Sequence, residues 1–455
     1  MTLDEHARAR AATVRARLDT IAVPEPRAVL RRARRRRRIV VTAGAVALVA
    51  ATVTPIALVA SNHHSSRRIE TVGPTGGTVG PTTEGFPPGA TVKLPWAAIP
   101  KESAGLGAGT QLQALTSDGA ALLLAGEKLD GDRRATAIWR SDDGVHWTEA
   151  DYPPARASVT ALGANGDTAL AVGTPTGGNA FVWRSRDGGR NWEEIASGDV
   201  FGKPVPNSRP SASVSGLLWR DGWWIAYGGA ADGYEGIWIS RDGTRWRLVL
   251  DSRSSGSVGG IVGTPDGSLM AYAGRVNARL STVEIGWFTT DPTSWGTPVA
   301  VRTPSRYSLA SVAPGARVAV GESIDRHDAP RLLLRSTDGG RTWTEDRTFR
   351  SMFPSAWAWT ATRSAGLDVL AGITATQVNQ SGPPAAWLSA DGRSWSTLPA
   401  SLAAPTPPPP NIPQLPPAGG LGLVASVGDR IVMMGFDAQL DRFYTFDGEW
   451  IGRRP

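Results

Sequence analysis

The sequence predicts an all-β protein, a seven-bladed β-propeller of four-stranded blades that follows a single transmembrane helix. Three observations lead to this prediction. A short motif built around an aspartate and a tryptophan recurs seven times, with 44 to 56 residues between successive aspartates. The chain has 53 glycines, 34 prolines and 18 tryptophans among 455 residues, a composition typical of strands joined by tight turns. An uncharged apolar segment of helix length lies at residues 39–60.

Residues 1–38 form a basic tail, which we expect to be cytoplasmic. The tail holds 12 arginines against four acidic residues, a net charge of +8, and because the whole chain carries +7, the remainder carries −1. The basic character is therefore confined to the tail. The rest of the chain has no bias towards polyanions, so that no nucleic-acid partner is expected.

Residues 39–60, IVVTAGAVALVAATVTPIALVA, predict the transmembrane helix. As a helix this segment reaches about 33 Å, enough to cross a hydrocarbon core of about 30 Å. The arginine run before it predicts a cytoplasmic N-terminus and an exported remainder. We therefore expect a single-pass cell-membrane protein that contacts the lipid bilayer through this segment.

The alternative for the same segment is a cleaved signal peptide, with Leu58 to Ser61 as the cleavage site. The apolar stretch is longer than the usual signal-peptide core of about 7 to 15 residues, which favours a retained anchor. Residues 61–91 are rich in glycine, proline and threonine and predict a flexible extracytoplasmic linker. Its neighbouring His63 and His64 are expected to be solvated linker residues rather than metal ligands.

Residues 92–455 hold the repeat. The second unit reads ASVTALGANGD, TALAVGTP, NAFVWRSRDGG and RNWEEI, which is four strands separated by glycine, asparagine and aspartate turns. Four strands and a period near 50 residues are typical of one propeller blade. A blade cannot bury its own faces, so the units are expected to stack into one closed ring.

The recurring motif resembles the Asp-box (BNR) repeat, Ser-x-Asp-x-Gly-x-Thr-Trp. Its copies are WRSDDGVHW, WRSRDGGRNW, WISRDGTRW, WFTTDPTSW, LRSTDGGRTW, WLSADGRSW and a degenerate FYTFDGEW. The fifth copy matches throughout, four copies have one residue fewer between aspartate and tryptophan, and in the fourth copy Pro292 replaces the glycine. The resemblance places the motif on the turn between the third and fourth strands of a blade.

The residue types suit such a turn, so we expect the motif to be structural and not catalytic. The carboxylate can accept bonds from backbone N–H groups, glycine supplies a positive φ, and tryptophan covers the hairpin. The residues concerned are Ser141, Asp143, Gly144, Trp147, Ser185, Asp187, Gly189, Trp192, Ser240, Asp242, Gly243, Trp246, Thr289, Asp291, Trp295, Ser336, Asp338, Gly340, Trp343, Ser389, Asp391, Gly392, Trp395, Asp447, Gly448 and Trp450.

The two ends of the repeat region predict how the ring closes. Thr91 to Pro100, TVKLPWAAIP, resembles the fourth strand of a blade, with Trp96 and Ile99 spaced like Trp192 and Ile195. We expect this N-terminal segment to complete the last blade, whose own fourth strand is cut short. The proline run from Pro405 to Pro417 is expected to be an extended insertion before that blade.

Asp-box propellers include sialidases, sortilin-type sorting receptors and photosystem assembly factors, so the resemblance leaves function open. A sialidase would require an arginine triad, a tyrosine nucleophile with a glutamate partner, and usually an Arg-Ile-Pro motif, which the sequence lacks. Tyr227, Tyr272 and Tyr444 lie in strand patterns with no evident glutamate partner. Sialidases also have six blades, against the seven counted in this chain.

The sequence offers few residues for thiol chemistry, histidine-based catalysis or metal binding. The chain has no cysteine, and His146 and His327 are the only histidines beyond residue 91, so no metal or cofactor is expected. The sequence therefore favours a membrane-anchored, non-enzymatic binding or scaffold domain for a protein, peptide or glycan, with no catalytic residue and no identified binding residue. The alternative is an exo-acting glycoside hydrolase of sialidase type. A catalytic carboxylate pair drawn from different blades stays open.

Overall fold

The computed structural model describes most of the repeat region. The described residues are 95–107, 109–130, 133–151, 157–175, 180–197, 201, 213–229, 234–255, 258–276, 282–324, 331–375, 382–399, 402, 421–435 and 442–447. The basic tail, the apolar segment 39–60, the linker and the proline run all lie outside them. Within the described part of the chain, no helix is long and apolar enough to cross a membrane.

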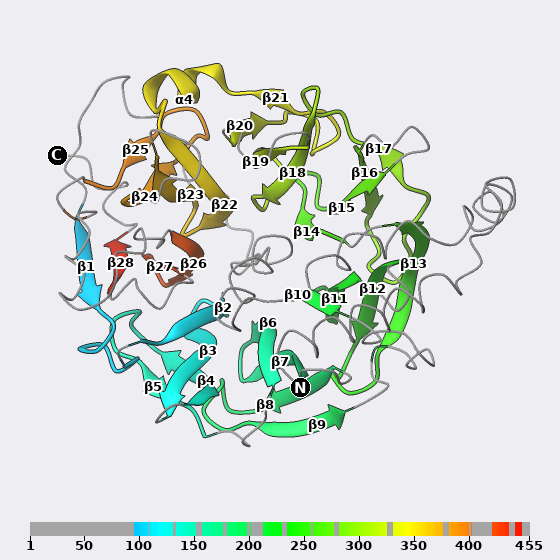
Figure 1. Cartoon of the computed structure of the whole chain (residues 1–455). Coiled ribbons are helices and arrows are strands. Elements are labelled where there is room, and N and C mark those ends of the chain that lie inside the picture. The colour runs from blue at the N-terminus through cyan, green and yellow to red at the C-terminus, as the bar shows by residue number, and fades with distance from the viewer. Residues whose placement is uncertain are drawn as a thin grey trace, which may run out of the picture. The chain divides into compact units, whose positions relative to one another are not determined.

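The described residues form seven antiparallel sheets of four strands each. Figure 1 shows these sheets as blades around a central axis, with the first strand of each blade innermost. Blade 1 is β2 (Gln111–Ser117), β3 (Leu122–Asp130), β4 (Arg133–Ser141) and β5 (Thr148–Glu149). Blade 2 is β6 (Ala157–Asn165), β7 (Thr168–Pro175), β8 (Phe181–Ser185) and β9 (Glu193–Ser197). Blade 3 is β10 (Ser213–Arg220), β11 (Trp223–Gly229), β12 (Tyr234–Ser240) and β13 (Arg247–Ser255).

The remaining blades follow the same order. Blade 4 is β14 (Gly260–Gly263), β15 (Leu269–Val276), β16 (Thr282–Thr289) and β17 (Val299–Ala300). Blade 5 is β18 (Tyr307–Val312), β19 (Val318–Ser323), β20 (Leu332–Arg335) and β21 (Thr344–Glu345). Blade 6 is β22 (Ala356–Ser364), β23 (Leu367–Thr374), β24 (Pro384–Ser389) and β25 (Ser396–Thr397), and it follows the short helix α4 (Arg347–Met352). Blade 7 is β26 (Leu421–Val427), β27 (Arg430–Gly435), β28 (Arg442–Asp447) and β1 (Trp96–Pro100).

The last blade closes the ring in the way the sequence predicts. The N-terminal strand β1 pairs antiparallel with β28, from Trp96 opposite Phe446 to Pro100 opposite Arg442. The indole of Trp96 packs on the ring of Phe446, with 5.0 Å between ring centroids. The outer edge of β28 is therefore covered by the opposite end of the repeat region, and blade 7 has four strands like the others.

The hydrophobic core consists of seven clusters, one for each interface between neighbouring blades. Each blade contributes one face to the cluster before it and the other face to the cluster after it: on β7, Ala169 and Ala171 face blade 1, and Leu170 and Val172 face blade 3. The cluster between blades 7 and 1 combines Leu423 and Phe443 with Leu112 and Trp139. Because this interface is packed like the other six, the ring is continuous.

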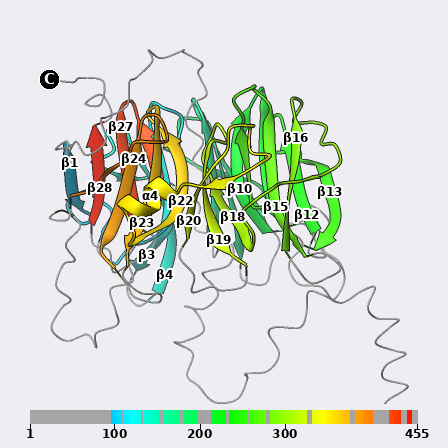
Figure 2. The same ribbon diagram turned by 90° about the horizontal axis from the view of Figure 1, so that it is seen from above.

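Antiparallel order gives the ring two different faces, which Figure 2 shows edge-on. The turns between first and second strands and those between third and fourth strands lie at one end, which we call the box face because it carries the repeated motif. The connections between second and third strands, together with the links from one blade to the next, lie at the other end, which we call the link face. Each motif therefore lies on the side opposite to the blade-to-blade links.

Candidate functional site

The second copy of the motif shows what its residues do. The Ser185 hydroxyl donates to Asp187 Oδ1 at 2.7 Å and accepts from the Gly189 N–H at 2.8 Å. Asp187 Oδ1 also accepts from the backbone N–H groups of Arg190 and Asn191, at 3.1 and 2.9 Å. The Trp192 indole N–H donates to the Gly189 carbonyl oxygen at 2.9 Å. Three side chains, those of Ser185, Asp187 and Trp192, thus satisfy the backbone of a single tight turn.

The other copies repeat this network with small changes. The serine donates to the aspartate in the first, third, fifth and sixth copies, at 2.8 to 3.1 Å. In the fourth copy the Thr289 hydroxyl donates to the Asp291 backbone carbonyl oxygen instead, and the Trp295 indole donates to the carbonyl of Pro292. Of the degenerate seventh copy, Asp447 ends β28, and Gly448 and Trp450 lie outside the described residues.

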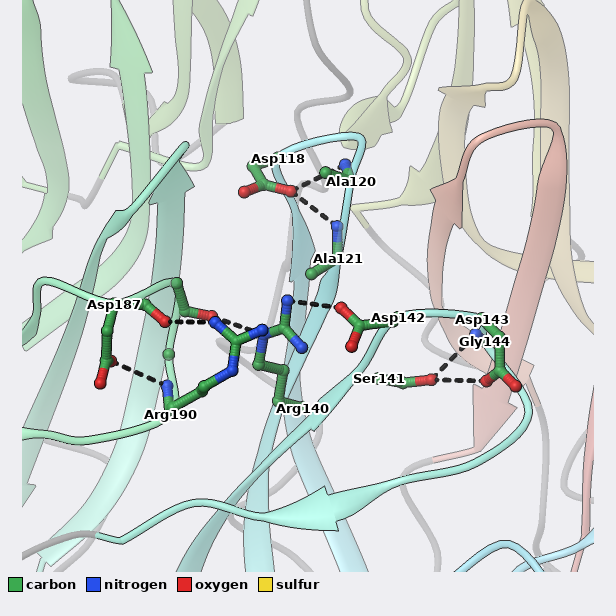
Figure 3. Close-up of polar contacts among 12 residues, drawn as sticks. Asp118, Ala120, Ala121, Arg140, Ser141, Asp142, Asp143, Gly144, Asp187 and Arg190 are labelled. Atoms are coloured by element: carbon green, nitrogen blue, oxygen red, sulfur yellow. Dashed lines mark hydrogen bonds and ion pairs between the residues drawn. The ribbon is translucent and has the colours of Figure 1, made fainter.

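Motif glycines also lie close to the preceding blade. Gly189 has a φ of 91°, and a Cβ added to it would lie 2.2 Å from Cδ2 of Leu123 in blade 1. Arg140, also in blade 1, donates from Nε to the Gly188 carbonyl oxygen at 2.8 Å and pairs with Asp142 of its own turn. Figure 3 shows this arginine between the turns of blades 1 and 2. The same relation recurs between Gly243 and Leu170, Gly340 and Met270, and Gly144 and Val432.

The motif carboxylates are held in their charged form. Partial burial acts to raise the pKa of Asp187, but hydrogen bonds from the backbone and side chain of Asn191 outweigh it, and the pKa falls to about 2. Burial also acts to raise the pKa of Asp143 and of Asp242. Hydrogen bonds from His146 outweigh it at Asp143, and backbone N–H groups outweigh it at Asp242, so that both pKa values lie well below the ordinary value. Such groups are poor proton donors near neutral pH.

The structure does not bring the motif aspartates together. Each of the six whose turn is described accepts its hydrogen bonds within its own turn, and each belongs to a different blade. Across the described residues no group of three or more metal-ligating side chains could hold a metal ion. What this arrangement does chemically is to fix turns and to join neighbouring blades.

The three tyrosines singled out as possible nucleophiles are buried. Tyr227, Tyr272 and Tyr444 are at most 1% exposed and belong to three different clusters between blades. A tyrosine in such a position packs the core and cannot reach a substrate. These positions give no support to a sialidase-type mechanism, whose nucleophile must contact the sugar.

Sequence reasoning missed two features that the structure reveals. Asp368, at the start of β23, is 1% exposed and pairs with Arg363 at 2.9 Å. On the first strand of the same blade, Trp357 and Trp359 are half-buried and belong to none of the seven clusters. Local sequence gives little signal for either, because an aspartate near a turn and tryptophans in a strand occur throughout the repeat.

Comparison with known proteins gives similarity of fold. No protein-family model and no curated protein matches the chain. Among similar solved structures, YCF48 bound to D1 peptide is 15% identical with a TM-score of 0.48 and covers 78% of this chain and 98% of its own. The β-propeller domain of the Trilobed protease from Pyrococcus furiosus is 10% identical, with a TM-score of 0.45 and coverages of 74% and 96%. The Hadza microbial sialidase Hz136 is 14% identical, with a TM-score of 0.38 and coverages of 77% and 67%. At such identities the likeness indicates no shared ligand or activity.

Proposed function

We propose that this protein is a membrane-anchored, extracytoplasmic binding or scaffold domain without catalytic activity, and that its ligand, a protein, peptide or glycan, binds at the link face. The contrast between the two faces carries this proposal. On the box face, polar side chains are engaged in turns of nearly constant form. On the link face, the connections between second and third strands vary in length, from the short one between Asp130 and Arg133 to the long one between Thr374 and Pro384. Variable connections on a rigid scaffold are where binding residues concentrate.

A sialidase-type hydrolase is the alternative, and two observations disfavour it. The tyrosines of the strand patterns are buried between blades, and the motif carboxylates have depressed pKa values that do not suit a general acid. Binding without turnover is therefore the activity that the described residues favour. Within the link face we place the ligand at the axial end, because the innermost strands of all seven blades meet there.

The full-length chain in detergent micelles tests this proposal. Immobilised protein is exposed to a glycan array and a peptide library, and the same preparation is assayed with a fluorogenic sialoside. We expect saturable binding without sialoside hydrolysis, and hydroxyl-radical footprinting should protect link-face residues. Hydrolysis that depends on the chain, or a footprint on the box face, would contradict the proposal.

The proposed topology has a separate test, because the chain contains no cysteine. Thr148 is exposed at the rim of blade 1, and Ala11 lies in the basic tail. In intact cells a membrane-impermeant maleimide should label the Thr148→Cys variant and leave the Ala11→Cys variant unlabelled until the cells are broken. Labelling of the Ala11→Cys variant in intact cells would show that the anchor is inverted.

A further inference from the structure

Two tryptophans stand apart from all others that the structure describes. Every described tryptophan except Trp357 and Trp359 belongs to, or packs against, one of the seven clusters between blades. Both exceptions are half-buried and lie two residues apart on β22, the innermost strand of blade 6. A tryptophan that does not pack a core leaves a large apolar surface available to something else.

The register of β22 determines where these side chains point. Ala358 belongs to the cluster between blades 5 and 6, so its neighbour Trp357 lies on the opposite side of the strand, towards blade 7. A bulge follows, because Ala358 pairs with Gly372 and Thr360 with Ala371, which leaves Trp359 as the extra residue. In this type of bulge the side chains of the extra residue and of the next residue lie on the same side of the strand. The next residue is Thr360, and its hydroxyl donates to the Gly422 carbonyl oxygen of blade 7 at 2.8 Å. Both tryptophans therefore face blade 7.

The two tryptophans also lie near the link-face end of the central axis. Strand β22 begins at the link face and runs towards the box face, and both tryptophans lie in its first half. The first strands of five other blades contain the same bulge, between Leu112 and Ala114 in blade 1 for example. The bulges therefore align positions in different blades at the axial end of the link face.

The aligned positions carry small or neutral polar residues where blade 6 carries tryptophan. The bulge residues of the other blades are Gln113, Thr160, Ser215, Ala310 and Gly422, and described residues two positions earlier are Gln111, Ser158 and Ser308. None of these side chains is charged.

One amide among them is incompletely satisfied. Gln113 is 4% exposed and donates from Nε2 to Glu127 at 3.0 Å, and the Ser158 hydroxyl donates to the same carboxylate oxygen at 2.8 Å. No described residue donates a hydrogen bond to Gln113 Oε1, which is buried. A buried acceptor without a donor is costly, which marks this position as one that is not optimised for stability alone.

We propose that Trp357 and Trp359 form a stacking platform for a neutral glycan at the axial end of the link face. The apolar faces of pyranose rings stack on indoles, while amides and hydroxyls around the axis match sugar hydroxyls. The residues named at these aligned positions include no cation to pair with a sialic-acid carboxylate, and the carboxylate that they contact, Glu127, would repel one. The inference rests on the proposed binding function and names the class of ligand.

The test measures binding of neutral oligosaccharides, namely cellohexaose, maltohexaose and mannohexaose, to the full-length chain in detergent by calorimetry. We expect at least one of them to bind, with an affinity that is unchanged between low and high salt because no charge is involved. The Trp357→Ala and Trp359→Ala variants should each weaken binding by about tenfold. The control is Trp223→Ala, since Trp223 is also half-buried but packs against the cluster between blades 3 and 4 and stacks on Arg241.

The variants are first compared by melting temperature, and Trp359→Phe replaces Trp359→Ala if the latter does not fold. Equal losses in the Trp223→Ala variant, preferential binding of sialylated oligosaccharides, or no binding of any neutral oligosaccharide would each overturn the glycan proposal. So would binding of a proline-rich peptide in place of glycans to the same tryptophans, although a peptide ligand would leave the proposed binding function intact. Hydrolysis of an oligosaccharide would instead overturn the proposed function itself.

Discussion

Asp187 shows how one side chain stabilises a turn through its charge. Its carboxylate accepts hydrogen bonds from Ser185 and from the backbone of Arg190 and Asn191, and these bonds are strongest when it is ionised. The pKa of Asp187 is about 2 in the folded protein, against an ordinary value of 3.8. Folding therefore favours the charged form, and the stabilisation depends on pH.

We predict that Asp187→Asn lowers the free energy of unfolding by about 1 kcal/mol at pH 7, less than the full linkage value because the carboxylate is partly exposed. The contribution of Asp187 is complete above pH 3.8 and is lost as the pH falls towards 2. The difference between wild type and variant should therefore shrink below pH 4, as measured by urea unfolding at several pH values. A difference that stayed constant with pH would mean that the charge is not what stabilises the turn.

Asp368 is expected to behave in the opposite way. In the strand register, Asp368 lies opposite Ser389, the serine of the sixth motif. The residues opposite the motif serines of blades 1, 2 and 3 are Leu122, Ala169 and Trp224. Burial dominates there and raises the pKa of Asp368, in spite of the neighbouring Arg363. A carboxyl group takes the place of an apolar side chain, and its second oxygen, Oδ2, has no hydrogen-bond donor among the described residues.

For Asp368→Asn we predict a pH dependence of opposite sign. A raised pKa means that the stability due to protonated Asp368 is present below its unfolded pKa and is lost as the pH rises through the folded value. The free energy of unfolding of the variant should therefore increase relative to wild type between pH 4 and pH 8, in the same urea titrations. If the Asp368→Asn variant instead lost stability relative to wild type as the pH rises, as we expect for Asp187→Asn, the ion pair with Arg363 would outweigh burial.

At the scale of the element, the motif turn works as a joint between two blades. The glycine of one turn lies against the second strand of the blade before it, and there is no room for a Cβ at Gly189. Its positive φ and its close approach to Leu123 are two separate reasons for glycine. Gly267, in the turn before β15, has a φ of 84° and open space around it, so that it shares only the first reason.

Comparing Gly189→Ala with Gly267→Ala separates these two effects. Gly267→Ala should lower the free energy of unfolding by about 1 kcal/mol, from backbone strain alone, and Gly189→Ala by about 2 to 4 kcal/mol, because overpacking adds to the strain. Thermal and urea denaturation measure both values. The double variant Gly189→Ala with Leu123→Ala should be less destabilised than the sum of its single changes. Equal effects of the two glycine changes would show that the contact between blades contributes nothing.

Sequence reasoning predicted elements well where a local pattern repeats, and less well where position depends on register. The four strands of a blade follow from turn residues such as Gly166 and Gly188, which recur at similar places. The bulges in the first strands have no such signal, yet one extra residue moves every following side chain to the other face of its strand. For that reason the sequence alone could not place Trp359 towards blade 7, nor distinguish it from the core tryptophans.

At the scale of the whole molecule, the number of blades and the manner of closure were both predictable. Seven evenly spaced motifs require seven units, and a last blade short of a strand requires one from elsewhere in the chain. What the motifs could not predict is a ligand, because their residues stabilise turns and the link-face positions differ from blade to blade.

A disulfide across the closing pair tests this closure directly. Ala97 of β1 lies opposite Thr445 of β28, and the chain has no cysteine of its own, so the Ala97→Cys, Thr445→Cys double variant has one intended bond. Oxidation should form it without a partner chain, and the oxidised protein should gain about 2 to 4 kcal/mol in free energy of unfolding over its reduced form. Non-reducing electrophoresis detects the bond, and denaturation under oxidising and reducing conditions measures the gain. The control combines Ala97→Cys with Thr148→Cys, because Thr148 lies in β5 of blade 1, a strand with which β1 does not pair. If the control bonded as readily as the closing pair, or if the closing pair failed to bond, β1 would not be the fourth strand of blade 7.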